Sequence, residues 1–318
     1  MLRPPHARGG GIRARMSVHA LHPPPLRLRH GHLRAVMRPL IRIAIVGTLL
    51  LAVAAGGSAA DQAKLFDAHL HYNGEVRPHL SAARALAKLD KAGVRAVVAN
   101  STPNDGSLAL AQAAYGGPVA VVLFLRPYRS DADRGTWFNN PAMAAFIDSE
   151  LARERRYRGI GEFHVHGAAD AKGTAMKHVV DVAVTRDLWL HAHCDAAALE
   201  AIFAHDPRVK VIWAHTGFTP PPAQIATYLA RHPTLMAELS YRSDVSSGTK
   251  VTDEWRALLL RYPDRFLLGS DTWTNERWTN YETIIDAYRR WLGDLPPAVA
   301  AKLQWDNGTR MFDLPQVK

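Results

Sequence analysis

The sequence predicts a (β/α)8 barrel, in which eight parallel strands alternate with helices. Three observations indicate this fold class. Short apolar runs alternate with amphipathic helical patterns from Leu65 onward, the runs number eight, and they extend over about 250 residues, the usual length of such a barrel. An open doubly wound sheet often has a glycine-rich phosphate loop, but neither GxGxxG nor GxxxxGK[ST] occurs here.

The predicted strands are short and mostly apolar, as expected for strands buried on both faces. In chain order they are Leu65–Leu70, Val94–Ala99, Val119–Leu125, Gly159–Phe163, Leu188–His193, Val209–Ala214, Leu235–Leu239 and Phe266–Ser270. Their number and order predict a single barrel domain without a second domain.

Helical patterns separate the strands or follow the last of them. They are Leu80–Ala92, Pro141–Arg153, Thr174–Arg186, Ala196–Ala204, Gln224–Arg231, Val251–Arg261, Glu276–Trp291 and Pro297–Leu303. Asn140 and Pro141 are a typical helix start, because a side-chain cap is followed by proline at the first helical position. Gly93 is typical of a helix end before the second strand.

The positive charge of the chain is concentrated in residues 1–60. This segment contains nine Arg and no Lys, Asp or Glu, while the whole chain has a net charge of +10. Subtracting nine from +10 leaves about +1 for residues 61–318. Nucleic acid is therefore not expected as a partner, because binding it requires a basic surface on the folded domain.

Residues 37–60 have the order of a secretory signal peptide. A cationic beginning, the apolar stretch Ile43–Ala55 and small residues before Asp61 follow one another. We therefore expect residues 1–60 to be a disordered basic extension plus signal peptide, and residues 61–318 to form a periplasmic or secreted barrel. The alternative is an uncleaved anchor in the inner membrane, although the apolar stretch is shorter than the roughly 20 residues of a spanning helix.

The chain contains a single cysteine, Cys194, so no intrachain disulfide can form. Export remains compatible with this, because a domain of this length buries a full core without disulfides. Cys194 follows His193 on a predicted strand and should point to the opposite face. We therefore expect it to pack rather than to bind metal.

Metal-binding side chains stand at the ends of five predicted strands. They are His69 and His71 on the first strand, Glu162 on the fourth, His191 and His193 on the fifth, His215 on the sixth and Asp271 on the eighth. In a barrel, the carboxyl ends of the strands meet at the face that carries active sites. Imidazoles and carboxylates bind divalent transition metals, so the pattern predicts a metal centre with one or two ions. Zn²⁺ is the expected ion and Mn²⁺ the alternative.

These motifs resemble the amidohydrolase superfamily across residues 64–314. The segments that carry the resemblance are Asp67-Ala-His-Leu-His71, the fifth-strand histidine, Trp213-Ala-His-Thr-Gly217 and Leu268-Gly-Ser-Asp271. The ending Asn307–Leu314 is similar to that of the amidohydrolase-related branch. The resemblance implies that His69, His71 and Asp271 ligate a first ion, and that Asp271 takes the proton from its bound water. It also implies that His193 and His215 bind a second ion, or in a one-ion variant help to hold the first and orient the substrate.

Glu162 departs from the commonest pattern of the superfamily, which has a carbamylated lysine on the fourth strand. Gly159-Ile-Gly-Glu162 resembles the Gly-Glu-Ile-Gly pattern of TatD-like hydrolases, where the glutamate bridges two ions. We therefore expect Glu162 to bridge, the alternative being an acid that orients a ligand histidine. On the fifth strand, we expect His193 to be the ligand and His191 to be a buried, hydrogen-bonded neighbour one layer deeper.

The expected reaction is hydrolysis of an amide, lactone or other ester, or phosphoester bond of a small molecule by a metal-activated water. Asp271 and His215 are the expected catalytic groups. Substrate contacts are expected from residues in or after the strand ends, namely Arg126, Trp137, His164 and Trp273. Arg126, and Arg242 after the seventh strand, would clamp a carboxylate or phosphate, and the tryptophans would form an apolar wall.

Other functions remain open at this stage. A mononuclear metal-dependent decarboxylase of the same superfamily would need one ion instead of two. A non-catalytic periplasmic binding protein is a further alternative, although the full ligand set is typical of an enzyme. A nuclease would follow from the TatD-like glutamate, but the nearly neutral domain disfavours it. A homo-oligomer is compatible with the sequence, and a membrane is expected as a partner only if the N-terminal segment stays uncleaved.

Overall fold

The computed structural model describes residues 63–314. The predicted signal segment lies outside these residues. Within the described range, none of the helices has the length and hydrophobicity required to span a bilayer.

Eight parallel strands form one sheet, in which each strand lies beside its neighbour in the chain. They are β1 (Leu65–His71), β2 (Val94–Asn100), β3 (Ala120–Leu125), β4 (Gly159–Val165), β5 (Trp189–Cys194), β6 (Lys210–Trp213), β7 (Leu235–Glu238) and β10 (Phe266–Leu267). Two further strands, β8 (Ser246–Ser247) and β9 (Lys250–Val251), form a separate antiparallel pair. All eight predicted barrel strands are confirmed.

Backbone hydrogen bonds join the two ends of the sheet. The Ala68 amide donates to the Leu268 carbonyl at 2.8 Å, and the Asp271 amide donates to the His69 carbonyl at 2.6 Å. Because these bonds connect β1 to the chain at and after β10, the sheet forms a nearly closed barrel. The predicted (β/α)8 fold is therefore confirmed.

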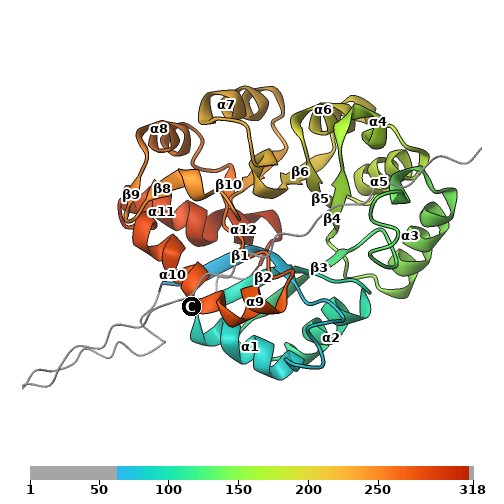
Figure 1. Ribbon diagram of the computed structural model, residues 1–318, viewed down its shortest axis with the longest axis horizontal. Coiled ribbons are helices and arrows are strands. Elements are labelled where there is room, and N and C mark those ends of the chain that lie inside the picture. The colour runs from blue at the N-terminus through green and yellow to red at the C-terminus, as the bar shows by residue number, and fades with distance from the viewer. Residues whose placement is uncertain (1–62, 315–318) are drawn as a thin grey trace, which may run out of the picture. The chain divides into compact units, whose positions relative to one another are not determined.

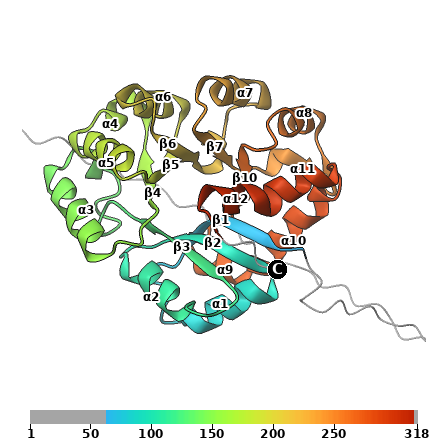
Figure 2. The same cartoon turned by 180° about the vertical axis from the view of Figure 1, so that it is seen from behind.

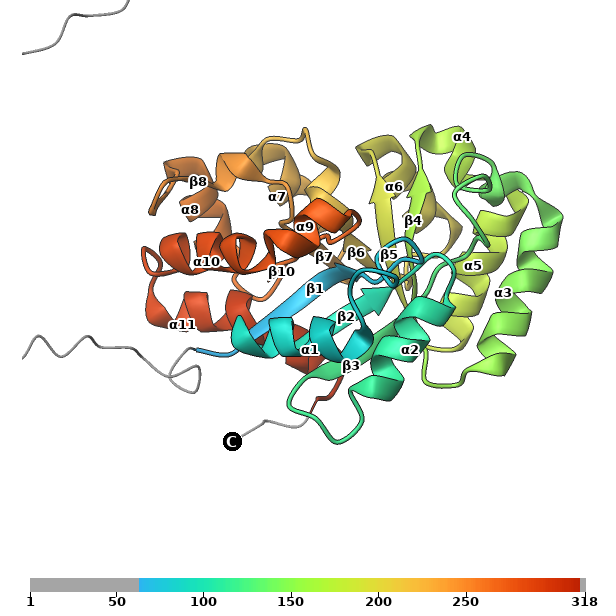
Figure 3. The same ribbon diagram turned by 60° about the horizontal axis from the view of Figure 1, so that its bottom comes forward.

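A ring of helices surrounds the strands (Figure 1). The long ones are α1 (Ala82–Lys91), α2 (Asp105–Ala113), α3 (Pro141–Arg153), α5 (Thr174–Thr185), α6 (Ala196–His205), α7 (Pro222–Arg231), α8 (Asp253–Arg261) and α10 (Tyr281–Leu292). The short ones are α4 (Gly167–Ala171), α9 (Asn275–Thr279), α11 (Pro297–Ala301) and α12 (Asn307–Met311). Figure 3 shows α3 beside α5 on one side of the strands, with α10 and α11 on the other.

The helix predictions differ from the structure at several places. The short helices α4 and α12 were not predicted. The predicted helix Glu276–Trp291 is divided at Asn280 into α9 and α10, and the Thr274 side chain caps α9 by accepting from the Arg277 amide. Helix α2 was not predicted, because Gly106 and Ser107 in its first turn interrupt the apolar pattern. Gly106 is required there, since a Cβ atom would lie 2.1 Å from the Tyr72 carbonyl oxygen.

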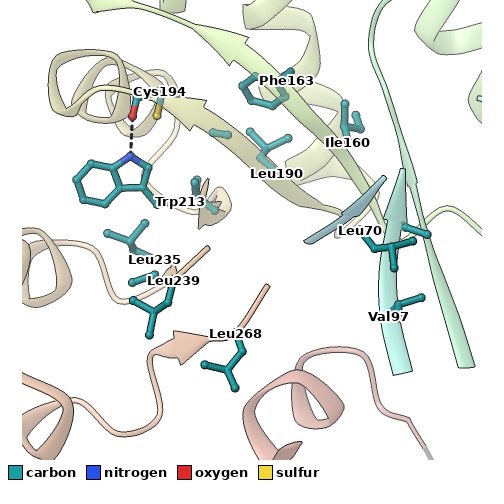
Figure 4. Packing of buried hydrophobic residues seen from close by; sticks show 14 of the residues in the cluster. Leu70, Val97, Ile160, Phe163, Leu190, Cys194, Trp213, Leu235, Leu239 and Leu268 are labelled. Atoms are coloured by element: carbon teal, nitrogen blue, oxygen red, sulfur yellow. Dashed lines mark hydrogen bonds between the residues drawn. The ribbon is translucent and has the colours of Figure 1, made fainter. Parts of the chain in front are cut away.

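The larger apolar cluster lies between the strands and the helices (Figure 4). Trp213 is fully buried in it, and its indole donates to the Cys194 carbonyl at 2.8 Å (Figure 4). Cys194 is buried as well, and burial raises the pKa of its thiol. The packing role that the sequence predicted for Cys194 is confirmed.

A smaller apolar cluster fills the inside of the barrel. Its members alternate along the strands with those of the outer cluster and include Phe66, Val98 and Phe124. Phe312 joins them from the end of α12, which lies beside β1 and β10 (Figure 2). The Phe312 ring is 5.9 Å from the rings of both Phe66 and Phe124, so the end of the chain helps to fill the barrel.

Replacing Phe312 by Ala should lower the free energy of unfolding by about 3–5 kcal/mol, because it removes a buried ring and leaves a cavity inside the barrel. Urea unfolding followed by circular dichroism measures this change. Leu260→Ala is the control, since Leu260 is 44% exposed and should give a change below about 1 kcal/mol. Equal midpoints for the two variants would contradict the role assigned to Phe312.

Candidate metal centre

The ends of the barrel strands bring the six predicted ligands together at the bottom of one cavity. The cavity has a volume of about 460 Å³, and its lining includes Glu162, His193, His215 and Asp271. His69 and His71 are fully buried next to these residues. The six candidate donors, which are spread along the chain from His69 to Asp271, therefore meet in one place.

The first group of donors consists of His69, His71, Glu162 and Asp271. The Nε2 atoms of His69 and His71 are 3.0 Å apart. Asp271 Oδ1 lies 3.4 Å from the first and 3.0 Å from the second. Glu162 Oε1 is 3.5 Å from His69 Nε2, and Glu162 Oε2 is 3.3 Å from His71 Nε2.

These distances fit a divalent ion. Donors placed about 2.1 Å from one ion in a tetrahedral shell lie about 3.4 Å from one another, which is the spacing observed here. Asp271 Oδ1 is also buried without a hydrogen-bond partner in the described part of the chain. A buried carboxylate oxygen that faces two imidazole nitrogens and has no hydrogen bond is suited to binding a cation.

The second group of donors consists of Glu162, His193 and His215. Glu162 Oε1 lies 3.0 Å from His193 Nδ1 and 3.4 Å from His215 Nε2. His215 Nε2 is 3.8 Å from Asp271 Oδ2. Glu162 therefore contacts both groups, and the second group provides donors for a second ion or for a wider shell around one.

Arg126 binds the same glutamate. Its Nη2 lies 3.1 Å from Glu162 Oε2, and its Nε donates to the Glu162 carbonyl at 2.8 Å. Arg126 is buried, although it lines the cavity. Its charge thus compensates Glu162, which leaves the guanidinium less free to clamp a substrate anion than the sequence analysis expected.

Glu238 at the end of β7 is a buried carboxylate beside the candidate ligands that the sequence alone did not indicate. It is fully buried, and its Oε2 lies 3.0 Å from His69 Nδ1 and accepts from the His215 amide at 3.1 Å. Ser240 Oγ donates to Glu238 Oε2 at 2.8 Å and lies 2.8 Å from His215 Nδ1. These contacts turn the Nε2 atoms of both histidines toward the centre. The position of Glu238 at the end of a predicted strand was the signal that could have identified it.

His191 is fully buried beside His69, and their ring centroids are 4.3 Å apart. The expected burial is therefore correct. The expected hydrogen bonds are not found, because both ring nitrogens lack a partner among the described residues. Burial lowers the pKa of His191 well below its ordinary value, so the ring is neutral. His193 instead lines the cavity.

The residues expected to contact substrate divide into two sets. His164 and Trp273 line the cavity, as Arg126 does. Trp137 does not: it is fully buried, its ring centroid lies 5.3 Å from that of Phe163, and its indole donates to the His164 carbonyl at 2.9 Å. The expected substrate contact of Trp137 is thus replaced by a packing role.

Arg242, the other arginine considered for a substrate anion, also lies away from the cavity. It is buried, pairs with Asp244 at 2.7 Å and stacks 4.7 Å from the centroid of Trp255. Its guanidinium also donates to the carbonyls of Thr216 and Pro220. Arg242 therefore holds the loops after β6 and β7 together.

Attraction between opposite charges dominates the electrostatics of the centre. Burial works against a charged His69, but Asp271, Glu162 and Glu238 outweigh it and raise the pKa of His69 well above the ordinary value. Burial also works against charged carboxylates, but the attraction of His69 outweighs it and lowers the pKa values of Asp271 and Glu162. Both carboxylates are therefore ionised at neutral pH.

His164 adds a neutral ring to the wall of the cavity. Burial lowers its pKa to about 2. Its ring stacks on His193 with centroids 4.3 Å apart, and its Nδ1 lies 3.1 Å from the Tyr128 hydroxyl. A neutral imidazole held from both sides can exchange hydrogen bonds with a substrate without adding charge.

Comparison with known protein families identifies the chain. A family model described as amidohydrolase matches residues 66–314, which is most of the sequence. The chain belongs to the amidohydrolase family. No curated protein is significantly similar to this amidohydrolase.

Several solved structures share the fold of this amidohydrolase at low sequence identity. A putative 2-pyrone-4,6-dicarboxylic acid hydrolase from Pseudomonas putida is 14% identical, with a TM-score of 0.53 over 80% of this chain and 98% of the other. A TatD homologue from Escherichia coli is 17% identical, with a TM-score of 0.54 over 80% and 98%. An amidohydrolase from Burkholderia multivorans with bound zinc is 16% identical, with a TM-score of 0.50 over 80% and 100%.

Metal binding by this amidohydrolase should strengthen as the pH rises and should release protons. The raised pKa of His69 means that the free histidine still carries a proton near neutral pH, and an ion must displace this proton in order to bind. Zinc affinity should therefore be higher at pH 8 than at pH 6. Calorimetric titration of the zinc-depleted enzyme in two buffers of different ionisation enthalpy measures the proton count. Equal affinity at both pH values, with no proton released, would contradict this assignment.

Glu238→Gln should weaken metal affinity about 10- to 100-fold, because an amide cannot replace the charged partner of His69. Competition with a chelator measures the affinity. Glu276→Gln, a substitution of the same type away from the cavity lining, is the matched control and should leave the affinity unchanged. Thermal unfolding of the zinc-depleted variants separates lost affinity from a damaged fold, and unaltered affinity in folded Glu238→Gln would refute the positioning role.

Proposed function

We propose that this amidohydrolase is a metal-dependent hydrolase that cleaves an amide, lactone or other ester, or phosphoester bond of a small molecule. One observation carries the proposal: six donor side chains of the types that bind zinc meet beside a cavity of about 460 Å³, and four of them line it. A cavity of this volume suits a small molecule rather than a polymer.

The metal would be held by His69, His71 and Asp271, with Glu162, His193 and His215 available for a second ion. Zinc is the proposed ion, because imidazole and carboxylate donors suit it and a similar fold contains it. When bound, a divalent ion polarises the bond under attack and lowers the pKa of a bound water to about 7.

The side chains of the centre would each have a separate role in the reaction. Asp271 lines the cavity and has a lowered pKa, so its carboxylate is ionised and ready to accept a proton at Oδ2. His215 lies 3.8 Å from that oxygen and would orient the bond under attack. Glu162 would connect the two groups of donors, and Arg126 would keep its carboxylate ionised and in place.

A decarboxylase that uses a single ion is the second candidate. The ion pair between Arg126 and Glu162 favours it, because the guanidinium binds Oε2, the oxygen that faces His71, and so leaves Glu162 less able to bridge two ions. The two candidates therefore differ in the number of ions bound and in the dependence of this number on Glu162.

Export to the periplasm or the exterior is proposed from the order of residues 37–60 alone. An uncleaved anchor in the inner membrane is the alternative. Comparing the N-terminal residue of the protein from a membrane fraction and from a soluble fraction distinguishes the two.

Metal content is the first test of the proposed function. Purified full-length protein, loaded with zinc or manganese and then desalted, should contain close to two equivalents by plasma mass spectrometry. Glu162→Gln and Asp271→Asn should each lower the content, because each removes a charged donor. Glu75→Gln and Asp131→Asn are matched controls, since both residues line the cavity outside the donor groups.

The outcomes are distinct. Two equivalents together with hydrolysis of lactones, amides or phosphoesters would support the hydrolase. One equivalent that is unchanged in Glu162→Gln would favour the decarboxylase. If neither zinc nor manganese binds, the proposed function is wrong.

A further inference from the structure

Three aromatic residues form one wall of the cavity above the metal centre. Phe218 follows β6, Tyr241 follows β7 and Trp273 follows β10, and all three line the same cavity as Glu162 and Asp271. We call these three residues the aromatic rim. The other residues that line the cavity are polar or charged, so the rim is its apolar part.

The rings of the aromatic rim are unusually exposed. Phe218 is 43% exposed, Tyr241 45% and Trp273 49%. In residues 63–314 only two other large hydrophobic side chains, Tyr115 and Leu260, are exposed to a similar or greater extent. Single exposed apolar residues need no explanation, but three gathered at one cavity mark a binding surface.

Two of the three aromatic residues have a positive backbone φ, a conformation that folding alone would favour for glycine rather than for a bulky side chain. Phe218 has φ 63° and ψ −52°, and Tyr241 has φ 59°. Glycine adopts positive φ readily, whereas a bulky side chain does so with strain. A strained conformation at a site indicates a function for the side chain, and here that side chain faces the cavity.

Each ring is also held in place. Phe218 stacks on His215 with centroids 4.1 Å apart. The Arg277 guanidinium lies 4.0 Å from the centroid of Tyr241, and the Trp273 indole donates to the Tyr241 hydroxyl at 2.8 Å. Rings that are fixed before binding lose little conformational entropy when a ligand stacks on them.

We propose that the substrate carries a planar, π-rich ring beside the bond that reacts, and that the aromatic rim binds this ring by stacking. The position of the bond rests on the proposed function, whereas the preference for a planar ring rests on the rim. A planar π-rich ring gains the electrostatic attraction of stacked aromatic faces, which a saturated ring of the same size lacks. The polar side of the cavity then receives the functional group attached to the ring.

A comparison of benzoate with cyclohexanecarboxylate tests the proposal. Both probes have one carboxylate and a six-membered ring, but only benzoate is planar. Calorimetric titration of the zinc-loaded full chain should show benzoate binding about 3- to 10-fold more tightly. Trp273→Leu, which keeps an apolar side chain, should reduce this ratio toward one. Tyr115→Leu, an exposed ring outside the cavity lining, should leave the ratio unchanged.

Phe218→Leu provides a second variant, with its zinc content measured because Phe218 contacts His215. This substitution should lower the ratio of benzoate affinity to cyclohexanecarboxylate affinity while zinc stays bound. Equal affinities in the unaltered protein, no measurable benzoate binding, or a ratio that survives both rim substitutions would overturn the proposal. If zinc binds and a test ester is hydrolysed but the ratio is one, the rim proposal fails and the proposed function stands. If zinc does not bind, the proposed function fails independently of the ratio.

Discussion

The hydrogen bonds between β1 and the chain at and after β10 are the constraint on which the rest of the structure depends. They close the sheet, and the bond from the Asp271 amide to the His69 carbonyl also brings two of the proposed ligands into contact. Asp67 strengthens the same seam, because its carboxylate accepts from the Ser270 amide and from the Tyr281 hydroxyl, both at 2.9 Å. Closure of the barrel and the juxtaposition of the candidate ligands therefore depend on the same contacts.

Closure also concentrates opposite charges among side chains that are almost fully buried. Glu162 and Asp271 are stabilised as carboxylates by His69, and Arg126 compensates Glu162 from the other side. Such a cluster would be costly to bury without these partners. The same carboxylates make the centre attractive to a cation, because an ion that replaces the proton of His69 keeps the charges balanced.

The expectation that the strand ends gather the candidate donors agrees with the structure, which brings His69, His71, Glu162, His193, His215 and Asp271 together. Each of them lies in a short motif that ends a strand, so local pattern and barrel geometry were sufficient. The same reasoning failed for Trp137, which was expected to contact substrate. A loop residue has no such geometric rule, and the fold turns Trp137 into the core instead of the cavity.

The sequence by itself determined the barrel and which candidate donors lie at its strand ends, because both follow from periodicity and from the common direction of parallel strands. Only the tertiary structure decided which groups surround those donors. The pairing of Arg126 with Glu162, the support of His69 by Glu238 and the assembly of the aromatic rim join separate strands or loops. The physical reason is that such contacts depend on side-chain packing between segments distant in the chain, which no local pattern encodes.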